Sequence, residues 1–151
     1  MKKLLILLLL FVNIGLNAQK HQWNRMALST EYRYLGRNVL GLGLEYRVPH
    51  KDEMTFNIGA KAFYTHLNGT PKIVPQINAE YGMILLGGIS ITPYAIEPQV
   101  SFNFMNLLAI NTGYAIPIDK NNYFRGITFG IKINIGVSRD SQYYQKFDVG
   151  F

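Results

Sequence analysis

The sequence alternates between apolar and polar or small residues along most of its length. The clearest stretch is Gly126–Val137, where Ile, Phe and Val fill every second position and Thr, Gly, Lys and Asn fill the others. A period of two is typical of a β-strand whose two faces meet different surroundings. The same alternation predicts strands over residues 26–34, 40–48, 54–64, 76–85, 94–104, 108–116, 126–137 and 143–151.

Residues that favour turns separate these segments. Gly, Asn, Pro and Asp cluster at residues 36–38, 49–52, 68–71 and 117–122. No segment with a helical period lies between the predicted strands, which excludes parallel strands joined by helices. The sequence therefore predicts an all-β fold of eight antiparallel strands joined up-and-down by short loops.

Two stretches leave the strand assignment open. In Leu86–Pro93, Gly87-Gly88 suggests a turn, while Ile89–Ile91 is compatible with an extension of either neighbouring strand. We expect Gln142–Phe151 to be the eighth, closing strand. If it is a tail instead, Gly126–Val137 must close the sheet, and the count falls to seven unless Ile89–Ile91 belongs to a strand of its own. Pro98 removes a ladder donor, so we expect a bulge there.

The residues between the apolar positions indicate which face meets water. A soluble barrel would turn the apolar face inward, whereas a membrane barrel turns it outward to lipid. The polar face is rich in glycine, which is disfavoured on exposed strands but fits the narrow lumen of an eight-stranded barrel. These glycines are Gly41, Gly43, Gly59, Gly82, Gly113, Gly130, Gly136 and Gly150.

The charged residues of the strands share the glycine face and none interrupts the apolar face. Five acids and five bases make up this set: Glu31, Arg33, Glu45, Arg47, Lys61, Glu80, Glu97, Lys132, Lys146 and Asp148. Equal numbers of opposite charges are expected in an interior, because an unpaired buried charge is costly. The pattern therefore predicts a transmembrane β-barrel whose lumen is filled by small residues and a salt-bridge network, without a wide pore.

Tyrosines add a third indication, because they lie on the apolar face near predicted strand ends. They are Tyr32, Tyr34, Tyr46, Tyr64, Tyr81, Tyr94, Tyr114 and Tyr143. Amphipathic rings occupy such positions in the two interfacial girdles of a membrane barrel.

Composition agrees with an exported membrane barrel. The 151 residues suit one domain, and only 16% are charged, against about 25% in a typical soluble domain. There is no cysteine, which excludes disulfides and thiolate chemistry. The net charge of +6 is scattered and includes no basic run, so no nucleic-acid partner is expected.

The first residues have the three parts of a secretory signal. Lys2 and Lys3 precede the apolar stretch Leu4–Val12, and Leu16-Asn17-Ala18 resembles a cleavage site. We therefore predict a cleaved signal peptide at residues 1–18 and a barrel domain at residues 19–151. An uncleaved anchor is the alternative, but the apolar stretch is short for a span of about 20 residues.

With this export signal, eight alternating segments and a terminal aromatic residue, the chain resembles the small outer-membrane β-barrel proteins of Gram-negative bacteria. That class includes the OmpA transmembrane domain and OmpX-like barrels. The resemblance implies a location in the cell outer membrane, contact with outer-membrane lipid, and assembly by the barrel-insertion machinery. The residues that match the insertion signal of the class are Tyr143, Phe147, Val149 and Phe151.

The resemblance also implies an orientation and a role. If both termini face the periplasm, the loops near Arg37, Asn68, Met105 and Asp140 lie outside, and all are short. We therefore predict a structural or interaction role with an unidentified envelope partner, and no catalytic, cofactor or metal site.

Two alternatives stay open. The first is a lipid-modifying enzyme in the same barrel, acting on acyl chains of lipid A. It would need a His, a Ser and an acid together, but His21, His50 and His66 all lie in or near turns without such neighbours, and their separation gives no metal-ligand spacing. The second is a secreted soluble ligand-binding barrel.

Overall fold

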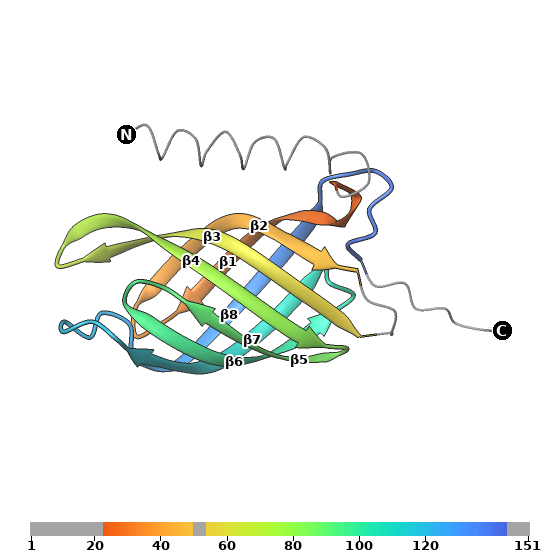
Figure 1. Ribbon diagram of the computed structural model, residues 1–151. Coiled ribbons are helices and arrows are strands. Elements are labelled where there is room, and N and C mark those ends of the chain that lie inside the picture. Colours follow the sequence, from red (N-terminus) through yellow and green to blue (C-terminus); the bar gives the residue numbers. More distant parts are fainter. Residues whose placement is uncertain (1–22, 50–53, 145–151) are drawn as a thin grey trace, which may run out of the picture.

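The computed structural model describes residues 23–49 and 54–144. These residues form a closed barrel of eight antiparallel strands, each paired with the next along the chain (Figure 1). The elements are the 3-10 helix η1 (Trp23–Arg25) and the strands β1 (Met26–Tyr34), β2 (Asn38–Val48), β3 (Thr55–Leu67), β4 (Thr70–Gly82), β5 (Leu85–Ile91), β6 (Ala95–Phe104), β7 (Leu108–Pro117) and β8 (Gly126–Gly136). The predicted fold class is confirmed. Within the described ranges, no helix is long and apolar enough to cross a membrane.

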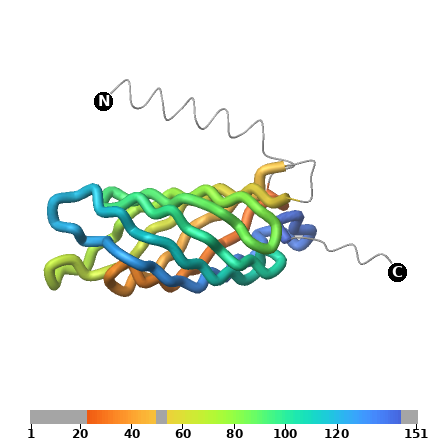
Figure 2. The backbone as a smooth tube through the Cα atoms, turned by 90° about the horizontal axis from the view of Figure 1, so that it is seen from below, coloured from red at the N-terminus to blue at the C-terminus, as the bar shows by residue number. Residues whose placement is uncertain are grey.

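The barrel has two ends that carry different connections. The end that holds η1, the turns at 83–84 and 105–107, and the segment 137–144 is called the near end. The far end holds the turns at 35–37, 68–69 and 92–94 and the loop 118–125. The β3–β4 hairpin and the loop 118–125 extend farthest beyond the barrel at the far end (Figure 1, Figure 2).

The barrel closes through β8, so the prediction that residues 142–151 form the eighth strand is wrong. β8 pairs with β1 from Ala27↔Gly136 to Tyr34↔Phe129. The eighth strand of the count is β5, from the stretch that the pattern left unassigned, and it pairs with β4 and β6. The alternative that gave residues 89–91 a strand of their own is therefore correct. Residues 145–151 lie outside the described part of the chain.

The additional strand also changes which loops share an end. Arg37 and Asn68 lie at the far end as expected, but Met105 and Asp140 lie at the near end together with η1. β5 adds one crossing between Asn68 and Met105, and each crossing exchanges the two ends. The predicted grouping of all four loops on one side is thus wrong.

The turn between β4 and β5 lies at Met83–Ile84 and not at Gly87-Gly88. Gly82 precedes this turn with a φ of +151°, and a Cβ there would lie 2.1 Å from the carbonyl oxygen of Leu85. Only glycine tolerates both this conformation and this approach. Gly87 and Gly88 instead continue the strand.

β4 begins at Thr70, inside the predicted loop 68–71. Asn68 and Gly69, with φ of 53° and 77°, form a two-residue hairpin turn in which both residues have positive φ. Pro71 and Pro75 then lie in the first part of β4, which precedes the predicted strand 76–85. They are tolerated because this part of β4 pairs with β3 alone, and the ladder with β5 starts only at Ile77.

Pro98 interrupts the β6–β7 ladder without the expected bulge. The pairs Ile96↔Ile116 and Gln99↔Gly113 keep the same offset on both sides of the interruption. A Cβ on Gly113 would lie 2.4 Å from the Pro98 carbonyl oxygen. Gly113 is the register partner of the next residue, Gln99, and its missing side chain leaves room for the Pro98 carbonyl group without a bulge.

Large apolar side chains cover the outer surface of the barrel. The most exposed are Ile127 and Ile73, at 75% and 73% of their accessible area, and outward Leu, Ile, Val, Phe and Tyr side chains occur on all eight strands. Inward positions hold most of the buried polar and charged residues. The polar face thus points inward, which is the reverse of a soluble barrel.

Inward glycines make room for larger side chains on the adjacent strand. A Cβ on Gly41 would lie 2.5 Å from the Phe63 ring, and one on Gly59 would lie 2.7 Å from the Glu45 carboxyl carbon. A Cβ on Gly43 would lie 2.1 Å from the Ala60 carbonyl oxygen and 2.6 Å from the Lys61 Cα. The glycine-rich face is therefore a consequence of how tightly the lumen is packed.

We expect Gly43→Ala to lower the free energy of unfolding by about 1–3 kcal/mol, because the added methyl group overpacks the lumen against backbone atoms. Gly87→Ala is the matched control, since Gly87 is exposed on β5 and no atom lies within 4 Å of its Cβ position. Denaturant titration of the folded barrel measures both. Equal effects of the two substitutions would contradict the crowded-lumen interpretation.

Candidate functional site

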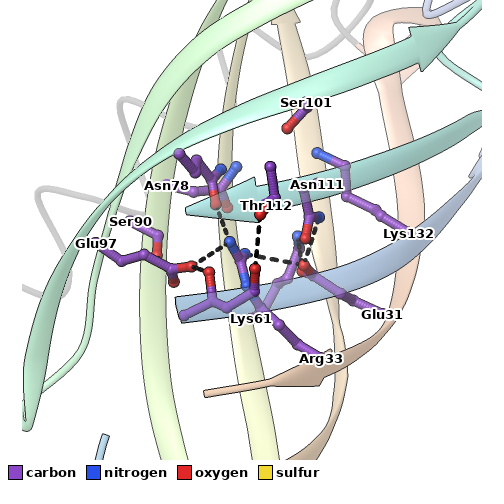
Figure 3. Close-up of polar contacts among 12 residues, drawn as sticks. Glu31, Arg33, Lys61, Asn78, Ser90, Glu97, Ser101, Asn111, Thr112 and Lys132 are labelled. Atoms are coloured by element: carbon purple, nitrogen blue, oxygen red, sulfur yellow. Dashed lines mark hydrogen bonds and ion pairs between the residues drawn. The ribbon is translucent and has the colours of Figure 1, made fainter. Parts of the chain in front are cut away.

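Seven of the ten charged residues predicted for the lumen are buried inside the barrel. They are Glu31, Arg33, Glu45, Lys61, Glu80, Glu97 and Lys132. Arg47 is half-buried at the near end, and Lys146 and Asp148 lie outside the described residues. Figure 3 shows the labelled members converging from different strands on the centre of the barrel.

Arg33 on β1 binds two carboxylates. Its Nη1 donates to Glu31 Oε1 at 3.0 Å, and its Nη2 donates to Glu97 Oε1 at 2.6 Å. Glu31 and Arg33 are two residues apart, so both point into the lumen, whereas Glu97 reaches them from β6. Arg33 Nη2 also donates to Gln99 Oε1. The guanidinium therefore links strands that are not neighbours in the sheet.

Each lysine lies between two carboxylates. Lys61 Nζ lies 2.6 Å from Glu31 Oε2 and 3.0 Å from Glu45 Oε1. Lys132 Nζ lies 3.4 Å from Glu45 Oε1 and 2.5 Å from Glu80 Oε2. Acids and bases thus alternate along one series of contacts, in the order Glu97, Arg33, Glu31, Lys61, Glu45, Lys132 and Glu80.

Gln99 closes this series of contacts into a ring by joining Glu80 to Arg33. Its Nε2 donates to Glu80 Oε1 at 2.8 Å while its Oε1 accepts from Arg33. We call the seven charged residues together with Gln99 the charge ring. It spans β1, β2, β3, β4, β6 and β8.

Neutral side chains hold the carboxylates of the ring in place. Asn111 Nδ2 donates to Glu31 Oε1 at 2.9 Å, and Ser101 Oγ donates to Glu80 Oε1 at 2.9 Å. Glu97 accepts from Ser90 Oγ at 3.1 Å and from Thr128 Oγ1. Buried carboxylates require such additional donors, because attraction to a cation alone does not offset the cost of leaving water.

The ring contains four carboxylates and three cations, so it carries one excess negative charge when all its members are ionised. The sequence predicted equal numbers of acids and bases. Among the described residues, the fourth cation, Arg47, instead donates from Nη1 to the backbone oxygen of Tyr144 at 2.9 Å, at the near end. The buried set is therefore more sensitive to the loss of a base than to the loss of an acid.

The far end of the lumen is closed by an apolar cluster that the sequence analysis did not predict. Its buried members are Leu35, Val39, Phe63, Leu67, Val74, Ala95, Ala115 and Phe124. We call this set the far-end cluster. Tyr94 packs edge-on against Phe124, with ring centroids 5.7 Å apart. A signal for it was present, because Phe63 is a bulky aromatic residue on the otherwise small and polar face of its segment.

Polar contacts fix the loop 118–125 over the far-end cluster. Arg37 Nε donates to the Tyr123 carbonyl oxygen at 2.9 Å, and its guanidinium carbon lies 5.4 Å from the centroid of the same residue's ring. Asn68 Nδ2 donates to the Tyr123 hydroxyl at 2.8 Å. Three connections at the far end are thereby tied together.

The sequence analysis expected Tyr143 on the lipid-facing side of a strand, and this prediction is wrong. Tyr143 instead closes the near end of the lumen. Its side chain is fully buried, and its carbonyl oxygen accepts from Asn106 Nδ2 at 2.9 Å. Burial raises the pKa of the Tyr143 hydroxyl well above its usual value, and the negative charge of Glu45 adds to the shift. The other residues assigned to the insertion signal, Phe147, Val149 and Phe151, lie outside the described part of the chain, as does the predicted signal peptide at residues 1–18.

Among the residues that the structure describes, no acid or serine side chain bonds to His66, the histidine considered for catalysis. His66 is exposed on β3, its ring packs edge-on against Tyr64 at a centroid distance of 5.5 Å, and its carbonyl oxygen accepts from Arg37. His21 and His50 lie outside the described residues. Among the residues that are described, no three His, Cys, Asp or Glu side chains are placed to hold a metal ion.

The lumen therefore has three layers: the far-end cluster, the charge ring, and an amide-rich layer closed by Tyr143. In the amide-rich layer, Asn103 Nδ2 donates to Asn106 Oδ1 at 2.6 Å, and Asn134 Nδ2 donates to the Asn106 carbonyl oxygen at 3.0 Å. Comparisons with protein-family models, with curated proteins and with solved structures found no match to this chain.

Proposed function

We propose that the chain is an integral outer-membrane β-barrel protein with a structural or interaction role. The observation that carries this proposal is the reversed polarity of the barrel, with charges enclosed in the lumen and isoleucine, leucine and aromatic side chains on the outside. Soluble monomers rarely expose a continuous apolar surface of this extent, whereas a bilayer requires one. The barrel also has no open sheet edge between β8 and β1, as a membrane-spanning sheet demands.

Exposed tyrosines support the same conclusion. Tyr32, Tyr34, Tyr64 and Tyr114 lie on the outer surface toward the far end, and Tyr81 lies toward the near end. Rings at these two levels match the interfacial girdles of membrane barrels. The layered, closed lumen favours a structural or interaction role over transport. No arrangement among the described residues favours the lipid-modifying alternative.

The first test is migration on a detergent gel of protein folded into lipid vesicles. A membrane barrel migrates faster unheated than after boiling, and it fractionates with outer membranes when expressed in a Gram-negative cell. Recovery of the protein from the soluble periplasmic fraction without detergent would overturn the proposal.

A depth-dependent substitution series makes a sharper prediction. Ile131 lies outward at the middle of β8, and we expect Ile131→Lys to lower the stability of the barrel in vesicles by about 2–4 kcal/mol. Ile127→Lys, at the far end of the same face, is the control and is expected to cost about 0–1 kcal/mol. Urea titration in vesicles measures both. In a soluble barrel both substitutions would be tolerated at the surface and would raise solubility.

A further inference from the structure

A groove lies on the outer surface at the far end, where the loop 118–125 enters β8. Its volume is about 560 Å³, and its lining includes Tyr34, Tyr114, Asn122, Arg125 and Ile127. The strand register explains why two tyrosines flank it: Tyr114 lies opposite Ile127, and Tyr34 lies opposite the next outward residue of β8. The groove therefore lies at the level of the exposed tyrosines of the far end.

Two glycines keep this groove open. Gly36 and Gly126 have φ of 78° and 83°, and no atom lies within 4 Å of the Cβ position of Gly126. Side chains other than glycine rarely adopt these conformations. The loop can thus turn sharply into β8 and leave a hollow beside Arg125.

Arg125 is exposed, and within the described part of the chain its guanidinium forms no hydrogen bond or ion pair. Its backbone nitrogen donates to the Leu35 carbonyl oxygen, whereas Arg37 at the same end uses its guanidinium to bind the carbonyl oxygens of Tyr123 and His66. Arginine presents a planar fork that matches phosphate. The Asn122 amide and the two tyrosine hydroxyls provide further donors around the same hollow.

The apolar surface continues directly from the groove along β8. Ile127 lines the groove, and Phe129 and Ile131 follow on the same outward face of β8. A ligand that uses both parts must combine an anionic head group with acyl chains. A free anion would leave the apolar part unused.

We infer that this groove binds the phosphate-bearing head group of an outer-leaflet lipid, with the phosphate on Arg125 and an acyl chain along β8. This inference rests on the proposed function, because it requires the far end to lie in the outer leaflet. The proposed function implies only nonspecific contact between lipid and the outer surface, whereas this inference assigns one specific lipid site.

The test uses the full barrel in detergent micelles and purified diphosphorylated lipid A as the probe, with binding measured by native mass spectrometry. We expect Arg125→Ala to weaken binding about tenfold or more, as the loss of a charged hydrogen bond implies, and Arg125→Lys to weaken it less. Lys72→Ala is the matched control, since Lys72 is an exposed cation of the far-end hairpin outside the groove. It should bind as the unsubstituted protein does.

The outcomes separate the site from the proposed function. If Arg125→Ala binds as tightly as the unsubstituted protein, or if lipid A stripped of phosphate binds equally well, the site is wrong while the membrane barrel stands. If the unsubstituted protein shows no heat-dependent shift in migration in lipid, the proposed function fails and this inference fails with it. Phosphate-dependent binding that is lost only in Arg125→Ala supports both.

Discussion

Replacing Lys132 with methionine is expected to lower the free energy of unfolding by about 3–5 kcal/mol. Within residues 23–49 and 54–144, Lys132 is the only cation that forms an ion pair with Glu80, at 2.5 Å, and it also contacts Glu45. Its removal leaves four buried carboxylates facing two cations. A buried carboxylate without a cationic partner keeps its desolvation cost and loses its compensation. Urea titration of the barrel in vesicles, followed by the gel shift, measures the loss.

The opposite substitution should have a much smaller effect. Glu97→Gln retains an acceptor for Arg33 and for the neighbouring hydroxyl groups, and it brings the ring to three acids and three bases. We expect a loss of at most about 1 kcal/mol, the size of a neutral hydrogen bond. Adding Glu80→Gln to Lys132→Met should recover part of the stability. If Lys132→Met and Glu97→Gln lowered the free energy of unfolding equally, the excess negative charge of the ring would not contribute to the stability of the barrel.

Phe124→Ala is the second substitution with a large expected effect, a loss of about 3–5 kcal/mol. The Phe124 side chain has no exposed area and packs from the loop 118–125 into the far-end cluster. Its removal leaves an enclosed cavity, because the surrounding strands are fixed by the barrel and cannot collapse into the space.

Phe102→Ala provides the control for Phe124→Ala. Phe102 lies on the outer face of β6 and is half exposed, so its truncation leaves no enclosed cavity. Unfolding in vesicles should show the larger loss for Phe124→Ala, and amide hydrogen exchange should rise within the loop 118–125 in that variant alone. A larger loss for Phe102→Ala would mean that contact of the outer face contributes more to stability than the far-end cluster does.

The alternation of residue types was sufficient to predict the strand faces, because the period of two is a local property. Gly126–Val137 shows this: its isoleucines point outward and Lys132 points into the lumen. The pattern failed where a strand carries unusual residues. Pro71 and Pro75 made the first part of β4 look like a loop, and Gly87 and Gly88 made β5 look like a turn. Prolines and glycines in a sequence do not indicate whether a neighbouring strand is present to pair with them.

The contacts of the charge ring could not be predicted from the faces alone. Arg33 meets Glu97, 64 residues away, only because the closed barrel and its register bring β1 and β6 face to face across the lumen. Tyr143 shows the same limit. Its spacing fitted a continuing strand, but the chain after β8 turns over the near end, and Asn106 from a distant turn holds it there.

The connectivity of the charge ring bears on how the barrel assembles. Its bonds join β1 to β6, and β8 to β2 and β4, and these strands come together only after the sheet has closed. If the barrel spans a bilayer as proposed, a sheet with fewer strands would expose these charges to the bilayer interior, where each costs several kcal/mol. Partly inserted states therefore have a higher free energy than the closed barrel. We expect closure of the β1–β8 seam to be an all-or-none event, because only the complete barrel pairs the charges of the ring.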